Sequence, residues 1–341
     1  MLTQFKRRCY TPFKTPIERL YNLEAYFGDN CPELYIKRDD QLGLTSGGNK
    51  TRKLEFLVAD ALEQGADTLI TCGAVQSNHC RLTLAAANKE GLHCQLILEE
   101  RVKDSYSDMA SGNNFLYQLL GVESIKVVAN KSDLFQEMST LNSILKSKNR
   151  TGYIIPGGGS SPVGATGYVN CAFELLDQAK DQNLNLSALY VTSGSGGTHA
   201  GLLAGFHAKQ ISVPIYGISV NRNRIDQTAL IYDLAAKTCA HINTEPILTE
   251  DRVIVNDEFV RSTSEINAFG INAYNLLSVA LSNGDVTSLK SETCKEVPAV
   301  PLNKAPSATP VTVATPVTTT LLVLTSVTLA KDLKLLPRPP N

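Results

Sequence analysis

The sequence lacks the features that would assign it at once to several large functional classes. It has no excess charge of one sign, because 32 Lys and Arg residues face 33 Asp and Glu residues and the formal net charge is −1. Lys and Arg are scattered without a basic stripe, so we do not expect nucleic-acid binding. Residues 1–20 are basic but lack the continuous apolar segment of a secretory signal. No membrane span is predicted either, since TTLLVLTSVTLA is too short and too rich in hydroxyl groups.

Paired cysteines are also missing. The eight cysteines are spread singly, with no C-x-x-C pair and no dense framework: Cys9, Cys31, Cys72, Cys80, Cys94, Cys171, Cys239 and Cys294. We therefore expect reduced, mostly buried thiols in a cytoplasmic protein. Their spacing fits no zinc pattern and the five histidines are isolated, so no metal site is predicted. What remains is a chain of 341 residues, 43% apolar and 19% charged, which is typical of a soluble enzyme with one large or two medium domains.

Strand-like and helix-like segments alternate from Leu34 onward. Strands are predicted for YIKR, DTLITCG, HCQLILEE and SIKVVA, with helices around 54–62, 79–91 and 113–120. The glycine-dense segment IIPGGGSSPVGATG, residues 154–167, is a linker or a loop lining a site. The pattern then resumes with a helix at 168–176, the strand ALYVTSG, a helix opening at THAGLL and the strand PIYGISV. This order predicts an α/β fold with mostly parallel strands in two sheets or half-sheets, and a ligand crevice between them.

The turn VTSGSGGTHAG, residues 191–201, places Gly and Ser between a predicted strand and a predicted helix. Backbone N–H groups and the helix N-terminus would converge there on an anion, most simply a phosphate. The alternative is a flexible loop of small residues. The dinucleotide fingerprint fails because His199 stands at its third glycine, and the P-loop fails because Asn49 separates Gly48 from Lys50. A nucleotide-binding module is therefore disfavoured.

Three cations, Lys50, Arg52 and Lys53, crowd the start of one predicted helix. Each alone is explained as a surface residue, although a cation at a helix N-terminus is mildly unfavourable against the macrodipole. The crowding is explained if an anion offsets these charges. A phosphate-bearing aldehyde cofactor would do so while reacting with the lysine itself.

The run Gln76-Ser77-Asn78-His79 lies between a predicted strand end and a predicted helix start. Helix capping by Ser or Asn explains one of these four residues. Four hydrogen-bonding side chains at the carboxyl edge of a sheet instead favour a site that receives a substrate carboxylate at the helix start.

Together these segments resemble a known family. GGNKTRKLEFLVADALEQGADTLITCGAVQSNHCR, IIPGGGSSPVGATGYV and VTSGSGGTHAGLLAG are similar to the pyridoxal-phosphate enzymes of fold type II, in the group of D-cysteine desulfhydrases and 1-aminocyclopropane-1-carboxylate deaminases. The resemblance covers the chain from about Tyr10 to Val255. It implies two open, twisted, mostly parallel sheets with helices on both faces, as in the tryptophan synthase β-subunit. It also implies pyridoxal 5′-phosphate as cofactor, a small amino-acid substrate and a homodimer.

The resemblance assigns roles to individual residues. Lys50 would bind the cofactor aldehyde covalently and, with Ser77, would be catalytic. Besides Lys50, the cofactor would be held by Asn49, Lys53, Asn78, Gly194, Ser195, Gly196, Gly197 and Thr198. In this set Asn78 would bond the ring hydroxyl and the others the phosphate. Ser77 and the backbone amides of Asn78 and His79 would bind the substrate carboxylate.

The reaction implied is the α,β-elimination of D-cysteine to pyruvate, ammonia and hydrogen sulfide, with the amine of Lys50 removing the α-proton. The run SNHCR favours this lyase, because the deaminases of the group tend to carry Gln where His79 stands. The alternative is 1-aminocyclopropane-1-carboxylate deaminase, which would open the ring to give 2-oxobutanoate and ammonia.

The C-terminal part departs from the family pattern. A D-P-V-Y-T-G-K-like run and an H-T-G-G turn are missing, and Tyr274 lacks the expected context. Because such elements supply substrate-contacting tyrosines and the partner of the pyridine nitrogen, a cofactor-binding homologue with impaired catalysis is a further alternative. Residues 304–324, rich in Thr, Val and Pro, predict neither a packed helix nor a central strand. We expect a discontinuous cofactor domain at 1–52 and 154–280, a smaller inserted α/β domain at 53–153, and an atypical, irregular or disordered tail at 281–341.

Overall fold

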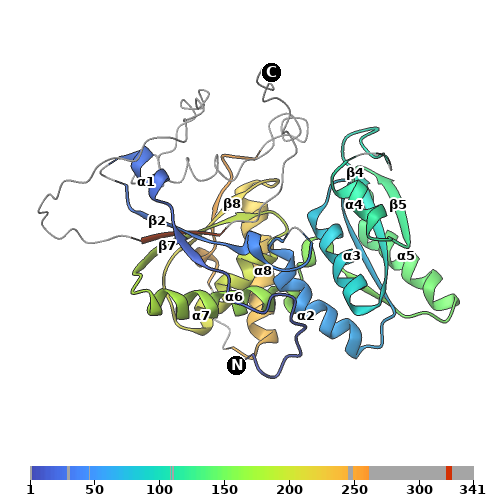
Figure 1. The fold of residues 1–341 in the computed structure, drawn as a ribbon, viewed down its shortest axis with the longest axis horizontal. Helices are drawn as coiled ribbons and strands as arrows, with labels where there is room; N and C mark the ends of the chain where they lie inside the picture. The colour runs from blue at the N-terminus through green and yellow to red at the C-terminus, as the bar shows by residue number, and fades with distance from the viewer. Residues whose placement is uncertain are drawn as a thin grey trace, which may run out of the picture.

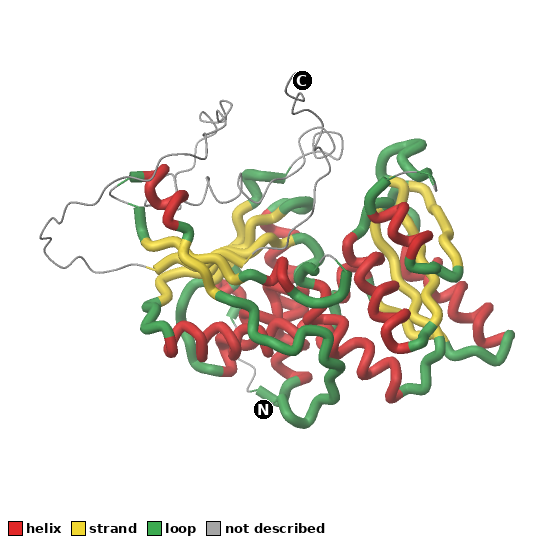
Figure 2. Tube along the Cα trace, in the orientation of Figure 1, coloured by secondary structure: helices red, strands yellow, loops and turns green. Residues whose placement is uncertain are grey.

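The computed structural model describes residues 2–28, 31–45, 47–107, 109, 111–244 and 249–260, together with the backbone of 320–324 (Figure 1). The strands of this part of the chain form one sheet of six strands and one of four. Figure 2 shows helices packed around each of the two sheets. The expectations for Tyr274 and for most of the tail lie outside the described residues.

The four-stranded sheet is entirely parallel and has the order β5-β4-β3-β6. Its strands are β3 (Thr68–Ala74), β4 (His93–Glu100), β5 (Ser124–Ala129) and β6 (Gly152–Ile155), and its helices are α3 (Asn78–Glu90), α4 (Asn113–Leu119) and α5 (Leu134–Ser147). Both faces are buried: Leu69 and Leu96 belong to the core beneath α3, while Ile70 and Ile97 belong to the core beneath α5. This alternation follows from the two-residue period of a strand.

The six-stranded sheet has the order β1-β2-β10-β7-β8-β9, and β1 is its single antiparallel strand. Its strands are β1 (Ile17–Arg19), β2 (Glu33–Lys37), β7 (Leu186–Ser193), β8 (Ile215–Ser219), β9 (Ile254–Asn256) and β10 (Thr320–Leu324), and the neighbouring helices are α1 (Tyr21–Phe27), α6 (Pro162–Asp181), α7 (Gly197–Ala208) and α8 (Arg224–His241). Helices α6, α7 and α8 share one apolar core with β7. Figure 1 shows the arrangement of these helices beside the sheet. The short 3-10 turns are η1 (Asp39–Gln41), η2 (Gly157–Gly159) and η3 (Glu250–Arg252).

Strand β10 corrects one expectation. Residues 304–324 were expected to provide no central strand, yet Thr320–Leu324 pair in parallel with both β2 and β7. The physical reason is visible in the sequence, because the five-residue run TLLVL contains no proline and is β-branched or apolar at every position. Proline interrupts the residues before it, and it does not reach this run.

Helix α2 (Lys50–Glu63) packs against α6 of the large sheet and against α3 of the small one. The contact with α6 is close, because a Cβ on Gly167 would lie 2.2 Å from the carbonyl oxygen of Arg52. Glycine is therefore required where the two helix backbones meet. As a result, the first turn of α2 is held between the two sheets.

The predicted fold class, α/β with mostly parallel strands in two sheets, is confirmed. Helices α1, α5 and α8 were not predicted, and α6 is longer than the predicted 168–176. No helix among the described residues is long and apolar enough to cross a membrane. Of the seven cysteines in the described part of the chain, all are free and five are buried.

Candidate active site

Three segments converge at the carboxyl edges of the two sheets. The turn after β7 leads into α7, the end of β6 leads into η2, and the end of β3 leads into α3. The start of α2 joins them, because Asn49 Nδ2 donates to Thr198 Oγ1 at 2.9 Å and a Cβ on Gly48 would touch Leu82 of α3. Ligands of open α/β sheets bind at such carboxyl edges. The structure thus brings the predicted residues of α2, α3 and the 194–198 turn into one region.

The turn at 194–198 has the geometry of an anion site. Gly196 is the N-cap of α7, with φ +84, and as glycine it has no side chain to cap the helix, while the N–H of Gly197 donates to Ser160 Oγ at 3.2 Å. The first N–H groups of a helix have no intrahelical partner, and the macrodipole adds positive potential there. The carbonyl oxygen of Gly194 accepts from Arg222 Nη1, just before α8, at 2.8 Å and from Gln227 Nε2 of α8 at 3.0 Å.

Lys53 places an ammonium group directly against this turn. Its side chain is 1% exposed, and its Nζ donates to the carbonyl oxygen of Gly158 at 3.0 Å. A Cβ on Gly197 would lie 2.9 Å from this Nζ, so only glycine leaves room for the ammonium at the helix start. Burial, and then the charge of Lys50, hold the pKa of Lys53 well below its usual range. No carboxylate among the described residues forms an ion pair with it.

Lys50 is the first residue of α2, and its Nζ donates to Asn49 Oδ1 at 2.9 Å. Burial lowers the pKa of this amine from 10.5 to about 8. A lowered pKa increases the fraction of unprotonated amine, which is the form that attacks an aldehyde or accepts a proton. Lys50 therefore has the properties of a nucleophile and a base. Lys53 differs from it in position, because its Nζ is held against the start of α7, where a bound anion would favour its charged form.

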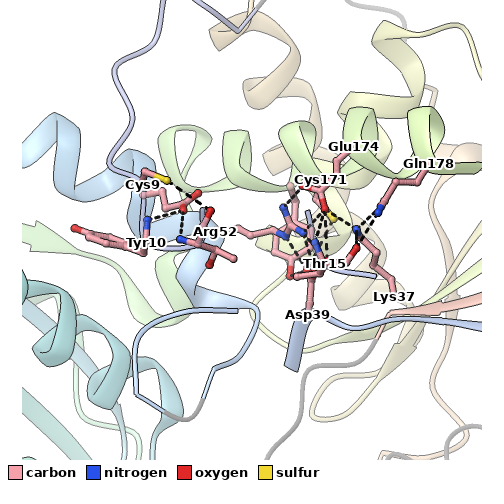
Figure 3. Close-up of polar contacts among 12 residues, drawn as sticks. Cys9, Tyr10, Thr15, Lys37, Asp39, Arg52, Cys171, Glu174 and Gln178 are labelled. Carbon is pink, nitrogen blue, oxygen red and sulfur yellow. Dashed lines mark hydrogen bonds and ion pairs between the residues drawn. The ribbon is translucent and has the colours of Figure 1, made fainter. Parts of the chain in front are cut away.

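Arg52 does not belong to this site, which corrects the interpretation of the three cations. Its Nε and Nη2 donate to the two carboxylate oxygens of Asp39 at 2.9 Å, and its Nη1 and Nη2 donate to those of Glu174, also at 2.9 Å. Figure 3 shows these carboxylates gathered with Thr15, Lys37 and Gln178 around one buried centre. The charge of Arg52 is thus offset by the protein itself. Only Lys50 and Lys53 are left for an outside anion.

The start of α3 carries the polar run predicted to bind a carboxylate. Ser77 is the N-cap, and its Oγ accepts from the backbone N–H of Cys80 at 3.2 Å. Asn78 Oδ1 accepts from Asn113 Nδ2 at 2.8 Å, and Asn113 Nδ2 also donates to the carbonyl oxygen of Gln76 at 2.8 Å. The capping explanation of Ser77 is therefore correct, and it leaves the hydroxyl proton of Ser77 available as a donor.

The ring of His79 is buried and neutral. Thr71 Oγ1 donates its single proton to the carbonyl oxygen of Ile155 at 2.8 Å, so at its 2.8 Å contact with His79 Nε2 it must accept. The ring proton therefore lies on Nε2, and Nδ1 has no partner among the described residues. Burial, with the charges of Lys50 and Lys53, lowers the pKa of His79 to about 3. His79 can thus offer a ligand its backbone amide but no charged imidazole.

The chemistry of the donors fits a phosphate-bearing aldehyde. A buried ammonium bonded to a carbonyl lies against Gly197 at the glycine-rich start of α7, and burying an uncompensated cation is costly unless an anion joins it. Lys50, whose amine could react with an aldehyde, lies three residues before Lys53 on the same helix. In the part of the chain that the structure describes, no cluster of His, Cys, Asp or Glu could hold a metal ion.

Several contacts of the site were not predicted. Ser160 bonds both Ser195 and Gly197, Asn113 holds Asn78, and Gly158 accepts from Lys53. The segment 154–167 was predicted to be a linker or a loop lining a site, and nothing in its composition indicates which serine faces the turn. The hydrogen bonds of Arg222 and Gln227 could not be predicted because α8 itself was missed.

The fold and the candidate site now define the class of protein. Residues 10–264 match the family described as pyridoxal-phosphate dependent enzyme, which covers more than half of the chain, and the protein belongs to this family. Its cofactor is pyridoxal phosphate, as the motifs predicted.

Comparison with individual proteins shows which members of this family the chain is similar to. The chain is 43% identical over 227 residues to D-cysteine desulfhydrase of Serratia proteamaculans, covering 66% of this chain and 68% of that protein. It is 39% identical over 280 residues to D-cysteine desulfhydrase of Yersinia enterocolitica, covering 81% and 82%. The solved structure of an ACC (1-aminocyclopropane-1-carboxylate) deaminase homologue matches with a TM-score of 0.66 and 31% identity, over 78% of this chain and 79% of that one. The predicted resemblance and fold type II are confirmed.

Proposed function

We propose that this protein is a pyridoxal-phosphate-dependent lyase that converts D-cysteine and water into pyruvate, ammonia and hydrogen sulfide. The observation that carries the proposal is the arrangement of Lys50. Its amine donates to Asn49, which donates in turn to Thr198 beside the glycine-rich turn, and its charge contributes to lowering the pKa of His79 at the start of α3. The substrate is proposed from the similarity to D-cysteine desulfhydrases over as much as 81% of the chain. Sulfide release from D-cysteine distinguishes this activity from the deamination of 1-aminocyclopropane-1-carboxylate.

The cofactor would be held by residues from the start of α2, from α3 and from the turn after β7. We propose that Lys50 binds its aldehyde, that Asn78 bonds its ring hydroxyl, and that its phosphate lies among the following residues: Asn49, Lys53, Gly194, Ser195, Gly196, Gly197 and Thr198. The ammonium of Lys53 and the N–H groups at the start of α7 support the phosphate position. When bound, pyridoxal phosphate supplies an electron sink for charge that develops at the substrate Cα.

Lys50 would perform the proton transfer. Its amine, with a pKa lowered to about 8 by burial, accepts the α-proton of the substrate. Asn49 Oδ1 accepts from this amine at 2.9 Å and so orients it. Burial is what lowers the pKa of this amine and so keeps part of it unprotonated near neutral pH.

The substrate carboxylate would lie at the start of α3. The hydroxyl of Ser77 and the backbone amides of Asn78 and His79 are the proposed donors there. Ser77 is fixed by its capping bond to Cys80 N and by the bond from Tyr117 Oη to its carbonyl oxygen at 2.9 Å. Because the ring of His79 is neutral, carboxylate binding rests on hydrogen bonds and the helix dipole.

A deaminase of 1-aminocyclopropane-1-carboxylate is the second candidate, because the solved homologue of that enzyme is 31% identical to this chain. The same lysine and carboxylate site would serve that substrate. The neutral, buried His79 stands where deaminases of the group tend to carry Gln, which favours the lyase.

The test is sulfide release from D-cysteine by the protein loaded with pyridoxal phosphate. We expect turnover that falls at least about a thousandfold in Lys50→Ala, because both the covalent attachment and the base are removed. Lys103→Ala, a change at an exposed lysine, is the matched control and should leave turnover unchanged. Release of 2-oxobutanoate from the cyclopropane amino acid without sulfide from D-cysteine would favour the deaminase instead. Cofactor binding without either product would point to the impaired homologue.

We further propose a cytoplasmic homodimer. The free thiols support a reducing compartment, since all seven described cysteines are unpaired. We also propose that residues 53–153 form a smaller domain inserted between 1–52 and 154–280, since β3, β4 and β5 of the four-stranded sheet and the start of β6 come from this segment. Light scattering coupled to size-exclusion chromatography measures the oligomeric state, and a monomer mass would contradict the dimer.

A further inference from the structure

The glycine-rich loop after β6 makes direct contact with the phosphate-binding turn. Ser160 Oγ accepts from the backbone N–H of Gly197 at 3.2 Å and donates to Ser195 Oγ at 2.8 Å. A Cβ on Gly197 would lie 2.8 Å from Ser160 Oγ and 2.9 Å from Lys53 Nζ. The hydroxyl of Ser160 and the ammonium of Lys53 therefore converge on the same point of the helix start.

The backbone of this loop is shaped for that contact. Gly158 has φ +70, and a Cβ there would lie 2.2 Å from Ser195 Oγ. Its carbonyl oxygen accepts from Lys53 Nζ at 3.0 Å, so one residue touches both the turn and the lysine. The left-handed backbone and the missing side chain let the loop lie flat against Ser195.

The hydrogen bond from Ser160 leaves the proton of Ser195 free for another acceptor. A hydroxyl has one proton and two acceptor positions, and Ser195 Oγ uses one acceptor position for Ser160. Among the described residues Ser195 Oγ donates to no acceptor. Its proton is therefore available to an anion at the start of α7.

We propose that Ser160 is a positioning residue for the cofactor phosphate, acting through Ser195. Its hydroxyl orients the Ser195 proton toward the phosphate and holds Gly197 at the helix start. This inference rests on the proposed phosphate site and adds a residue outside the turn to it. Ser160 contributes to the recognition of the phosphate and not of the pyridoxal ring.

The experiment compares two aldehydes that differ only in the phosphate. Dissociation constants of pyridoxal phosphate and of pyridoxal are measured from the Lys50-dependent absorbance change of cofactor-free protein. In Ser160→Ala the affinity for pyridoxal phosphate should fall roughly two- to tenfold, the loss of one neutral hydrogen bond, while the affinity for pyridoxal stays unchanged. Ser160→Gly is a second deletion that should give the same selective loss.

Ser161→Ala is the matched control, because the neighbouring Ser161 caps α6 by accepting from Gly164 N at 3.3 Å. It should lower the melting temperature without changing the preference for the phosphorylated aldehyde. In a Ser195→Ala background, Ser160→Ala should have little further effect, because the hydroxyl it orients is already gone.

If Ser160→Ala lowered the affinity for pyridoxal phosphate and for pyridoxal equally, the proposal would be overturned, since Ser160 would then have a merely structural role. Additive losses of affinity for pyridoxal phosphate in the Ser160→Ala, Ser195→Ala double variant would also overturn it, because Ser160 would then act independently of Ser195. If the unaltered protein does not prefer pyridoxal phosphate over pyridoxal, the phosphate site itself is wrong. That result is distinguishable from a failure confined to Ser160.

Discussion

Two adjacent cations of α2 have opposite surroundings. Arg52 is 3% exposed and has two carboxylate partners, Asp39 and Glu174. Lys53 is 1% exposed and has only the carbonyl oxygen of Gly158 as a partner among the described residues. Adjacent positions on a helix point about 100° apart, so one side chain faces α6 and the other faces the turn before α7. Both side chains are buried, but only the charge of Arg52 is offset by carboxylates of the protein.

This difference separates the scaffold of the site from its ligand-binding surface. Burial alone would raise the pKa of Asp39, but the charge and hydrogen bonds of Arg52, with the charge of Lys37, hold it below its usual range. For Lys53 nothing opposes burial, and its pKa falls. A buried cation without an anion is costly, and the protein retains it where a phosphate is expected to complete the pair.

The largest expected effect follows from breaking the network of Arg52. Asp39→Asn leaves Arg52 with one carboxylate and should cost roughly 3 kcal/mol of unfolding free energy in the cofactor-free protein. Urea unfolding measures this cost. The neighbouring Asp40→Asn is the control, because its pair with the partly exposed Arg38 should contribute less than about 1 kcal/mol. Equal losses in the two variants would contradict the assignment of Asp39 to the scaffold.

Removing the other cation should affect ligand binding and not stability. Lys53→Met eliminates a buried charge without a carboxylate partner, so the cofactor-free protein should be as stable as before or more stable. Its affinity for pyridoxal phosphate should fall roughly tenfold to a hundredfold, the loss of a charge-assisted hydrogen bond. Fluorescence titration measures the affinity, with unphosphorylated pyridoxal as the reference ligand. A large loss of stability with unchanged affinity would show that Lys53 belongs to the scaffold.

A third variant tests the contact between the loop and the turn. Gly158→Ala introduces a Cβ at φ +70 that would meet Ser195 Oγ, and it should cost about 1–2 kcal/mol for the backbone and weaken phosphate binding besides. Gly91→Ala is an apt control, because Gly91 has the same φ with nothing within 4 Å of the added atom. Stability and affinity are measured on both variants. We expect both variants to lose a similar amount of unfolding free energy, and only Gly158→Ala to lose affinity for pyridoxal phosphate.

The smallest effect concerns pH. The pKa of Lys50 is lowered from 10.5 to about 8, so the reactive unprotonated amine increases as pH rises through that value. The rate at which cofactor-free protein takes up pyridoxal should therefore rise about tenfold per pH unit below 8 and level off above it. Stopped-flow absorbance follows this rate. A midpoint near 10.5 would show that the reacting amine is an ordinary exposed lysine.

Much of this architecture could be predicted from the sequence. The helical spacing of Leu54, Leu57 and Leu62 and the β-branched run before Cys72 are local signals, and the corresponding helix and strand were predicted correctly. The role of Arg52 was not predictable, because Asp39 and Glu174 are far from each other in sequence and meet only in the folded chain. Strand β10 was missed for a similar reason. Its short apolar run forms a strand by pairing with β2 and β7, which are distant in sequence. The prolines near the run are unfavourable for a strand, so the local sequence did not predict it.

The central claim is that Lys50 reacts with the cofactor while Lys53, three residues later, binds its phosphate. The most direct measurement is borohydride reduction of the protein loaded with pyridoxal phosphate, followed by peptide mass mapping of the modified lysine. The account predicts one pyridoxyl group on Lys50 and none on Lys53. A label on Lys53, or on a lysine outside the start of α2, would contradict it.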